Sequence, residues 1–179
     1  MEDQKFAFAH IADGRIYLCQ KTGDFEQMEF EAVASGRDVA VAFDRTGELF
    51  VARKTAENKL YVAPANNLSA EEFLAEDVTS FDICRSNVFA KSSLACVFVS
   101  GQKLFLKERQ PVGVWKEQEL VELPAKIVPV RVRFARGAIQ NNVIVVTDGR
   151  GASHLFGSVE NPNASERWHI SCKPSIELS

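Results

Sequence analysis

The sequence predicts an all-β chain, and three observations support this. Short turn signals recur every 43 to 48 residues, runs of strand-forming residues flank each turn, and an aromatic residue follows each hairpin. The turns are Asp13-Gly14, Glu57-Asn58, Ser100-Gly101 and Asp148-Gly149, and the aromatic residues are Phe25, Phe73, Trp115 and Trp168. A period of roughly 45 residues is the length of one four-stranded β-propeller blade. We therefore expect about four antiparallel sheet repeats that form a small or partial β-propeller.

Each repeat is expected to contain two hairpin strands, an outer strand, and an apolar strand that begins the next repeat. The hairpin strands are predicted at 5–10 with 15–20, 48–53 with 59–63, 94–99 with 103–107, and 143–147 with 153–156. The outer strands are predicted at 27–33, 73–76, 115–123 and 167–172. The apolar strands are predicted at 39–43, 80–84 and 130–135.

Side-chain patterns distinguish these strands. Val39–Phe43 and Leu94–Val99 are continuously apolar, which is typical of strands buried on both faces. The segment 27–33 alternates polar and apolar residues, which indicates one exposed face. Each large aromatic residue is expected to bury on the order of 150–250 Å² between blades. Pro124 and Pro129 should bound strands, because proline cannot donate to a central ladder.

Only Leu68–Leu74 suggests a helix, since Ser69 and Glu72 have the spacing of a capping box, and we expect a loop there because the segment is short. No linker divides the sequence, so a single propeller-like domain is predicted over 1–179. Its four repeats either close into a small ring or stay open, with edges that need a partner. An antiparallel sandwich or barrel is the alternative fold, because it gives similar strands at similar spacing.

Composition limits the function. Apolar residues make up 46% of the chain, the net charge is −3 and the pI is about 5.7, which disfavours nucleic acid and anionic membranes as partners. The first residues form neither a signal peptide nor a membrane span, so the cytoplasm is the predicted compartment, with the nucleus as the alternative. In a reducing compartment Cys19, Cys84, Cys96 and Cys172 are expected to be thiols that pack as small apolar residues.

One part of the sequence resembles a repeat of the RCC1 type. The segments Val130–Gly137, Val143–Gly149 and His154–Gly157 follow its order of strand, glycine, strand, Asp-Gly turn and aromatic-glycine end. The other repeats depart from it: Ser100–Phe105 keeps the turn but lacks the terminal glycine, and none has the histidine that commonly follows the glycine. The RCC1 resemblance implies a seven-bladed propeller that regulates a small GTPase.

A second resemblance covers Leu94–Leu123, which is similar to sialidase-like and lectin-like propellers. It implies glycan binding through Trp115 or Trp168. Packing between blades is the simpler role for both tryptophans, and the absence of a signal peptide disfavours a glycan partner.

The sequence carries no motif of an enzyme, so no catalytic activity, cofactor or metal is predicted. His10, His154 and His169 have no ligand partners at metal-binding spacing. Asp82 has apolar neighbours, which is consistent either with an acid of raised pKa or with an acceptor of backbone N–H groups at a strand end. We favour the acceptor role, since no second acid or nucleophile accompanies it.

A cluster of cations is the strongest candidate for a binding site. Arg131 and Arg133 should share one face of a strand, opposite Val130, Val132 and Phe134, with Lys126 and Arg136 nearby. Guanidinium groups about 7 Å apart on one face can bind a carboxylate-rich peptide or phosphates. The alternative is a solvated face whose arginines pair with glutamates of the adjacent strand.

These observations predict a non-enzymatic protein-interaction or scaffold module. It would bind a partner protein through loops, an open sheet edge or the basic strand patch of Lys126, Arg131, Arg133 and Arg136. Regulation of a small GTPase and lectin-like glycan binding are the two alternatives.

Overall fold

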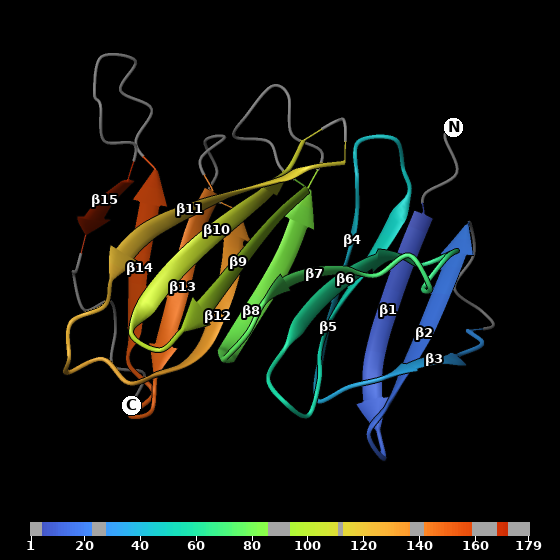
Figure 1. The fold of residues 1–179 in the computed structure, drawn as a ribbon, viewed down its shortest axis with the longest axis horizontal. Helices are drawn as coiled ribbons and strands as arrows, with labels where there is room; N and C mark the ends of the chain where they lie inside the picture. Colours follow the sequence, from blue (N-terminus) through green and yellow to red (C-terminus); the bar gives the residue numbers. More distant parts are fainter. Residues whose placement is uncertain are drawn as a thin grey trace. The chain divides into compact units, whose positions relative to one another are not determined.

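The fold is that of a computed structural model, and the residues that the structure describes are 5–22, 28–85, 94–110, 113–136, 142–158 and 168–171. These residues form fifteen β-strands and no helix, as Figure 1 shows. Accordingly, no membrane-spanning helix occurs in the ranges given above.

The strands form four antiparallel sheets in which neighbours along the chain pair with each other. Sheet A contains β1 (Lys5–Ala12), β2 (Arg15–Thr22) and β3 (Glu31–Ser35), and sheet B contains β4 (Asp38–Phe43), β5 (Leu49–Lys54), β6 (Leu60–Pro64) and β7 (Glu72–Ala75). Sheet C contains β8 (Val78–Arg85), β9 (Leu94–Ser100), β10 (Lys103–Arg109) and β11 (Trp115–Glu122). Sheet D contains β12 (Pro129–Arg136), β13 (Asn142–Asp148), β14 (Ser153–Ser158) and β15 (Trp168–Ser171).

This order confirms the prediction of an all-β chain with four antiparallel sheet repeats. The chain also divides into two compact units, Met1–Asp77 with sheets A and B, and Val78–Ser179 with sheets C and D. Each unit is described by itself, and the prediction of a single domain over 1–179 stays a prediction.

The hairpin turns follow two patterns. Asp13 and Gly14 form a two-residue turn with positive φ of 51° and 71°, the turn that Asp-Gly predicts. Longer turns follow β4, β5, β10 and β13, and each places a residue with positive φ at its fourth position: Gly47, Asn58, Gly113 and Gly151. The Asp148-Gly149 signal is therefore part of a longer turn, whose left-handed residue is Gly151 (φ 84°).

Sheets A and B of the first unit meet in a small apolar core. Leu18, Leu49 and Val51 are buried there, and half-buried residues from β1 and β4 pack around them. Gly36 lies in the short connection between the sheets, and its N–H donates to the carbonyl oxygen of Gly14 (3.0 Å). The next N–H, of Arg37, donates to the carbonyl oxygen of Lys54 (2.8 Å), so both sheets hold the connection.

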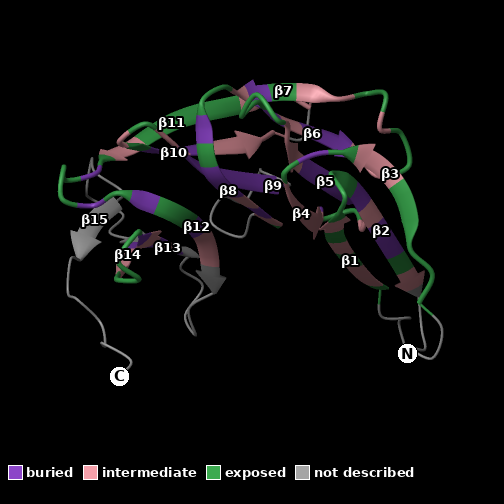
Figure 2. Cartoon of the chain, turned by 90° about the horizontal axis from the view of Figure 1, so that it is seen from below, coloured by how far each residue is buried: buried purple, intermediate pink, exposed green. Residues whose placement is uncertain are grey.

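The prediction that Val39–Phe43 is buried on both faces is wrong. Every residue of β4 is half-buried, and Figure 2 shows the strand in the intermediate colour along its length. β4 is the edge strand of sheet B, and sheet A has only three strands. In the other sheets the corresponding hairpin joins the second and third strands. No described strand therefore takes the innermost place in sheet A, and β4 is less covered. Leu94–Val99, in contrast, is fully buried as predicted.

Large aromatic residues are distributed differently from the prediction. Phe73 on β7 is 54% exposed, because its ring only meets the edge of Tyr61 on the neighbouring strand, with centroids 5.6 Å apart. Trp115 is half-buried, and Phe25 lies outside the described residues. The buried aromatic side chains are Phe50, Phe81, Phe98 and Phe156.

Side chains rather than a strand ladder join sheets C and D of the second unit. The N–H groups of Val132 and Phe134 on β12 donate to Ser80 Oγ (3.1 Å) and Asp82 Oδ2 (2.9 Å) on β8. Asp82 Oδ1 also accepts the N–H of Ile83 (2.9 Å), as the predicted acceptor role requires. Val132 belongs to the buried core that these two sheets share.

A first prediction concerns Gly36. A Cβ atom added there would lie 2.9 Å from Ile16 Cδ1 and 3.1 Å from the Lys54 carbonyl oxygen, so Gly36→Ala should lower the free energy of unfolding by about 1–3 kcal/mol. Gly149→Ala is the control, since the nearest atom there is 3.7 Å away, and should change it by less than about 0.5 kcal/mol. Denaturant unfolding measures both; equal effects would contradict the steric argument.

A second prediction concerns Ser80. Ser80→Ala leaves the buried N–H of Val132 without its acceptor and should cost about 1–3 kcal/mol of unfolding free energy. Thr79→Ala, on the exposed side of the same strand, should cost clearly less. If both variants unfolded at the same denaturant concentration, the bond between β8 and β12 would contribute no measurable stability.

Candidate functional site

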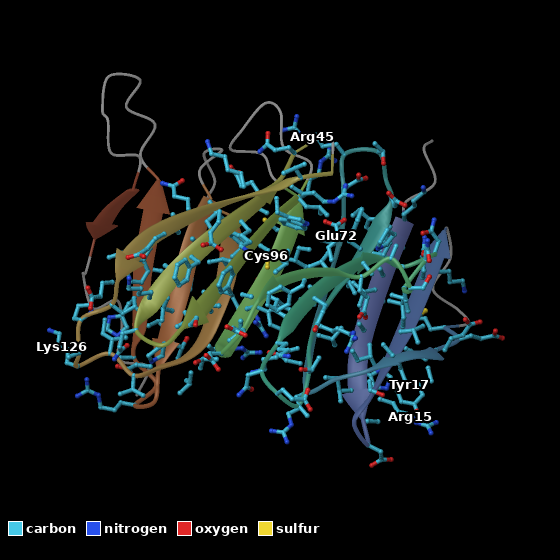
Figure 3. All side chains as sticks on the ribbon, viewed as in Figure 1. Arg15, Tyr17, Arg45, Glu72, Cys96 and Lys126 are labelled. Atoms are coloured by element: carbon cyan, nitrogen blue, oxygen red, sulfur yellow. The ribbon has the colours of Figure 1, made fainter. Side chains whose placement is uncertain are left out.

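The candidate site begins in the loop between β11 and β12. Leu123 and Ile127 are buried in the core of sheets C and D, and the Ile127 N–H donates to the Pro124 carbonyl oxygen (2.8 Å). This turn leaves Lys126 exposed at its corner, where Figure 3 shows its side chain extending outward. Val128 follows with 62% exposure. Two buried residues therefore fix the loop, while a cation and an apolar side chain face solvent.

The turn between β13 and β14 lies against this loop. The N–H of Gly149 donates to the carbonyl oxygen of Val128 (3.0 Å), and Arg150 Nη2 donates to the carbonyl oxygen of Lys126 (3.1 Å). The Arg150 side chain is nevertheless 74% exposed. These bonds place a second cation beside Lys126.

The side chain of Asp148 holds the backbone of that turn in place. Its buried carboxylate accepts, at Oδ1, the N–H groups of Arg150 (2.9 Å) and Ala152 (3.0 Å), and His154 Nε2 lies 3.3 Å from Oδ2. Loss of water by itself raises the pKa of this carboxyl. The two N–H donors, His154 and the Arg150 guanidinium outweigh that effect, so the pKa of Asp148 lies below its ordinary value of 3.8.

A β-bulge on β12 completes the site. The pairing with β13 shifts between Pro129 and Arg131, where Pro129 lies opposite Asp148 and Arg131 opposite Thr147. Val130, predicted on the apolar face with Val132, is instead 51% exposed, because the bulge interrupts the alternation of side chains. Arg131 is also exposed.

We call this surface the basic–apolar patch and define it by five exposed residues: Lys126, Val128, Val130, Arg131 and Arg150. Within the described ranges, no carboxylate pairs with Lys126 or Arg131, and the carboxylate near Arg150, Asp148, is itself buried. The patch therefore contains three exposed cations and two exposed apolar side chains, on neighbouring stretches of backbone that several hydrogen bonds hold in place. Such a surface can attract carboxylates and bury aliphatic groups.

The predicted basic cluster is only partly reproduced. Lys126 and Arg131 belong to the patch, whereas Arg133 Nη1 donates to the carbonyl oxygens of Phe81 (2.6 Å) and Val132 (2.9 Å) and so helps to join β8 and β12. The backbone of Arg136 ends β12, but its side chain lies outside the described part of the structure. No glutamate occurs opposite Arg131 or Arg133 on β13, so the alternative of glutamate pairing across that ladder does not apply.

Sequence reasoning missed Arg150, Val128 and Val130. Arg150 lies in a turn that looked like a simple hairpin connection. A signal was present, because Asp44–Glu48 and Asp148–Ala152 share the pattern Asp-x-x-Gly-x. In both segments the aspartate Oδ1 accepts the N–H groups of the third and fifth residues. That pattern predicts an exposed third residue, which is Thr46 in one turn and Arg150 in the other.

The other candidate residues occupy packing environments. His10 stacks on Tyr17 and meets the edge of Phe30, while the side chains of His169 and Trp168 lie outside the described part. Cys19 and Cys96 are buried free thiols and Cys84 is half-buried; burial raises the pKa of Cys96. Cys172 is not among the described residues, and those that are described include no cluster of metal ligands.

Comparison with known proteins returns no matching family model and no similar curated protein. The arrangement of the patch is therefore the basis for assigning a function.

A third prediction follows from Asp148. Asp148→Asn keeps an oxygen acceptor but removes the charge that the surrounding donors stabilise. Because the folded-state pKa is lowered, wild type should be more stable than the variant near neutral pH, and this advantage should disappear as the pH falls below 3.8 through the folded-state pKa. Urea unfolding across that range measures the difference, and a difference independent of pH would contradict the assignment.

Proposed function

We propose that this chain is a non-enzymatic protein-interaction module that binds an acidic segment of a partner protein through the basic–apolar patch. The observation that carries the proposal is that the exposed Lys126, Arg131 and Arg150 and the exposed Val128 and Val130 come from two loops and a bulge whose backbones are bonded to one another. Charge complementarity gives orientation and rapid association, and the two valines supply apolar contact area.

The rigidity of the patch supports this function. The backbone at Lys126 and Val128 is bonded to Arg150 and Gly149, and Asp148 fixes the turn that carries Arg150. Because this surface is ordered before binding, the partner does not have to supply the free energy for ordering it. A partner segment with two or more carboxylates next to a Leu, Ile or Val residue matches this arrangement.

Regulation of a small GTPase and glycan binding stay predictions from the sequence resemblances. No contact of the described residues favours either one over a peptide partner, and the cytoplasmic location that goes with the proposal stays a prediction as well.

A fourth prediction tests the patch. A short fluorescent peptide that contains Asp and Glu around two leucines should bind the wild-type chain, and added salt should weaken the binding because exposed charges contribute to it. A variant with Lys126→Glu, Arg131→Glu and Arg150→Glu should bind at least about tenfold more weakly, since attraction becomes repulsion. Fluorescence anisotropy measures both affinities.

The matched control carries the same change of charge elsewhere: Arg15→Glu, Arg37→Glu and Lys59→Glu replace three exposed cations of the first unit. It should bind the peptide like wild type, apart from a small effect of net charge. If the control variant lost binding to the same extent, net charge rather than the patch would account for the loss of affinity. The proposal would be contradicted if a peptide with lysine in place of Asp and Glu bound equally well.

A further inference from the structure

Among the strands that the structure describes, sheet A has three, one fewer than each of its three counterparts. The hairpins β5–β6, β9–β10 and β13–β14 join the second and third strands of their sheets, and β1–β2 has the same place in the repeat. The position beside β1 that corresponds to β4, β8 and β12 is therefore not filled by any strand of the described chain. β1 is eight residues long and forms the edge of the sheet.

The second unit shows what occupies the equivalent position. There β9 lies against β12 as β1 lies against β4 in the first unit. β8 pairs with β9 and also directs Ser80 Oγ and Asp82 Oδ2 to the N–H groups of β12. A strand beside β1 would thus pair with β1 and direct its side chains to β4.

Burial in the first unit points to the same position. Ala7 and Ala9 on β1, and Val39, Val41 and Phe43 on β4, pack on the core but are only half-buried. In the second unit Ala95 and Val97, which have the equivalent positions on β9, and Val132 of β12 are completely buried, while Phe134 of β12 is half-buried. Five of the eight half-buried apolar residues that pack on this core therefore lie on the two strands that would contact an added strand, and the other three are Val33, Ala65 and Leu68.

The backbone groups on one side of β1 are arranged to pair with a further strand. Ala12 and Arg15 flank a two-residue turn, and such a pair is hydrogen-bonded, so that bonding alternates along the ladder from there. The N–H groups of Ala7, Ala9 and Ile11 consequently point away from β2, toward the free edge. Exposed edges of this kind accept strands from other chains.

We infer that sheet A is completed in trans by an extended segment of a partner protein, which runs antiparallel to β1. The segment has the chemistry of β8: bulky apolar residues at alternate positions, which cover the core, and serine, threonine or aspartate between them, which accept N–H groups of β4. This surface is separate from the basic–apolar patch, and the inference does not depend on it.

The experiment uses the full chain and a synthetic peptide with the sequence of Val78–Arg85, in which Cys84→Ser prevents oxidation. Residue-resolved hydrogen exchange should show new protection at Ala7, Ala9 and Ile11 when the peptide binds. The N–H groups of Phe8 and His10 already bond to β2 and should change little. This alternation along β1 is the signature of an added strand, and it requires no variant.

Two variants test the edge. Ala9→Pro removes an outward N–H without removing a bond to β2, so the chain should still fold and bind the peptide about tenfold more weakly. Ala7→Pro provides the same test if Ala9→Pro does not fold. A peptide with Ser80→Ala and Asp82→Ala should bind more weakly than the parent peptide, while one with Phe81→Pro should not bind.

Four results would overturn the inference. The first is no peptide binding to the wild-type chain. The second is protection that does not alternate along β1, and the third is equal affinity of Ala9→Pro and wild type. The fourth is a dimer in light scattering whose β1 amides are already protected without peptide, because a second copy would then occupy the edge.

Discussion

The backbone groups of the innermost strands constrain this fold more than any other feature. An innermost strand pairs with one neighbour only, so the N–H and C=O groups on its other side need different partners. In the second unit Ser80 and Asp82 accept the N–H groups of β12, and Arg133 donates in return to the carbonyl oxygen of Phe81. Because these bonds hold β12 in place, they also hold the bulge and the two loops that form the basic–apolar patch.

Much of the fold could be predicted because its local signals are strong. Asp13-Gly14 adopts the backbone conformation that its residues favour, and each predicted strand overlaps an observed one. The burial of individual strands was harder to predict, since it depends on what lies alongside them. The apolar pattern of Val39–Phe43 resembles that of Leu94–Val99. Only Leu94–Val99 lies between two strands of its own sheet, whereas Val39–Phe43 lies on an edge strand.

The candidate site was half predictable for a similar reason. Lys126 stands out as a cation in an otherwise apolar loop and Arg131 as a cation on a strand, and both are exposed. Val130 did not stand out, because a bulge depends on pairing with another strand and leaves little trace in the strand that bends. Arg150 joins the site through a bond to the carbonyl oxygen of Lys126, which lies 24 positions away in the sequence. The alternation of polar and apolar residues along a strand carries no information about a contact between two distant loops.

The connection at Gly36 has a mechanical consequence. Only two residues separate β3 from β4, and the N–H groups of Gly36 and Arg37 are bonded to opposite sheets. Such a short linker cannot extend, so a pulling force on β3 would pass directly to β4 and would not be absorbed by a loop. Sheets A and B should therefore rupture together as one mechanical element, at the load that breaks their shared core.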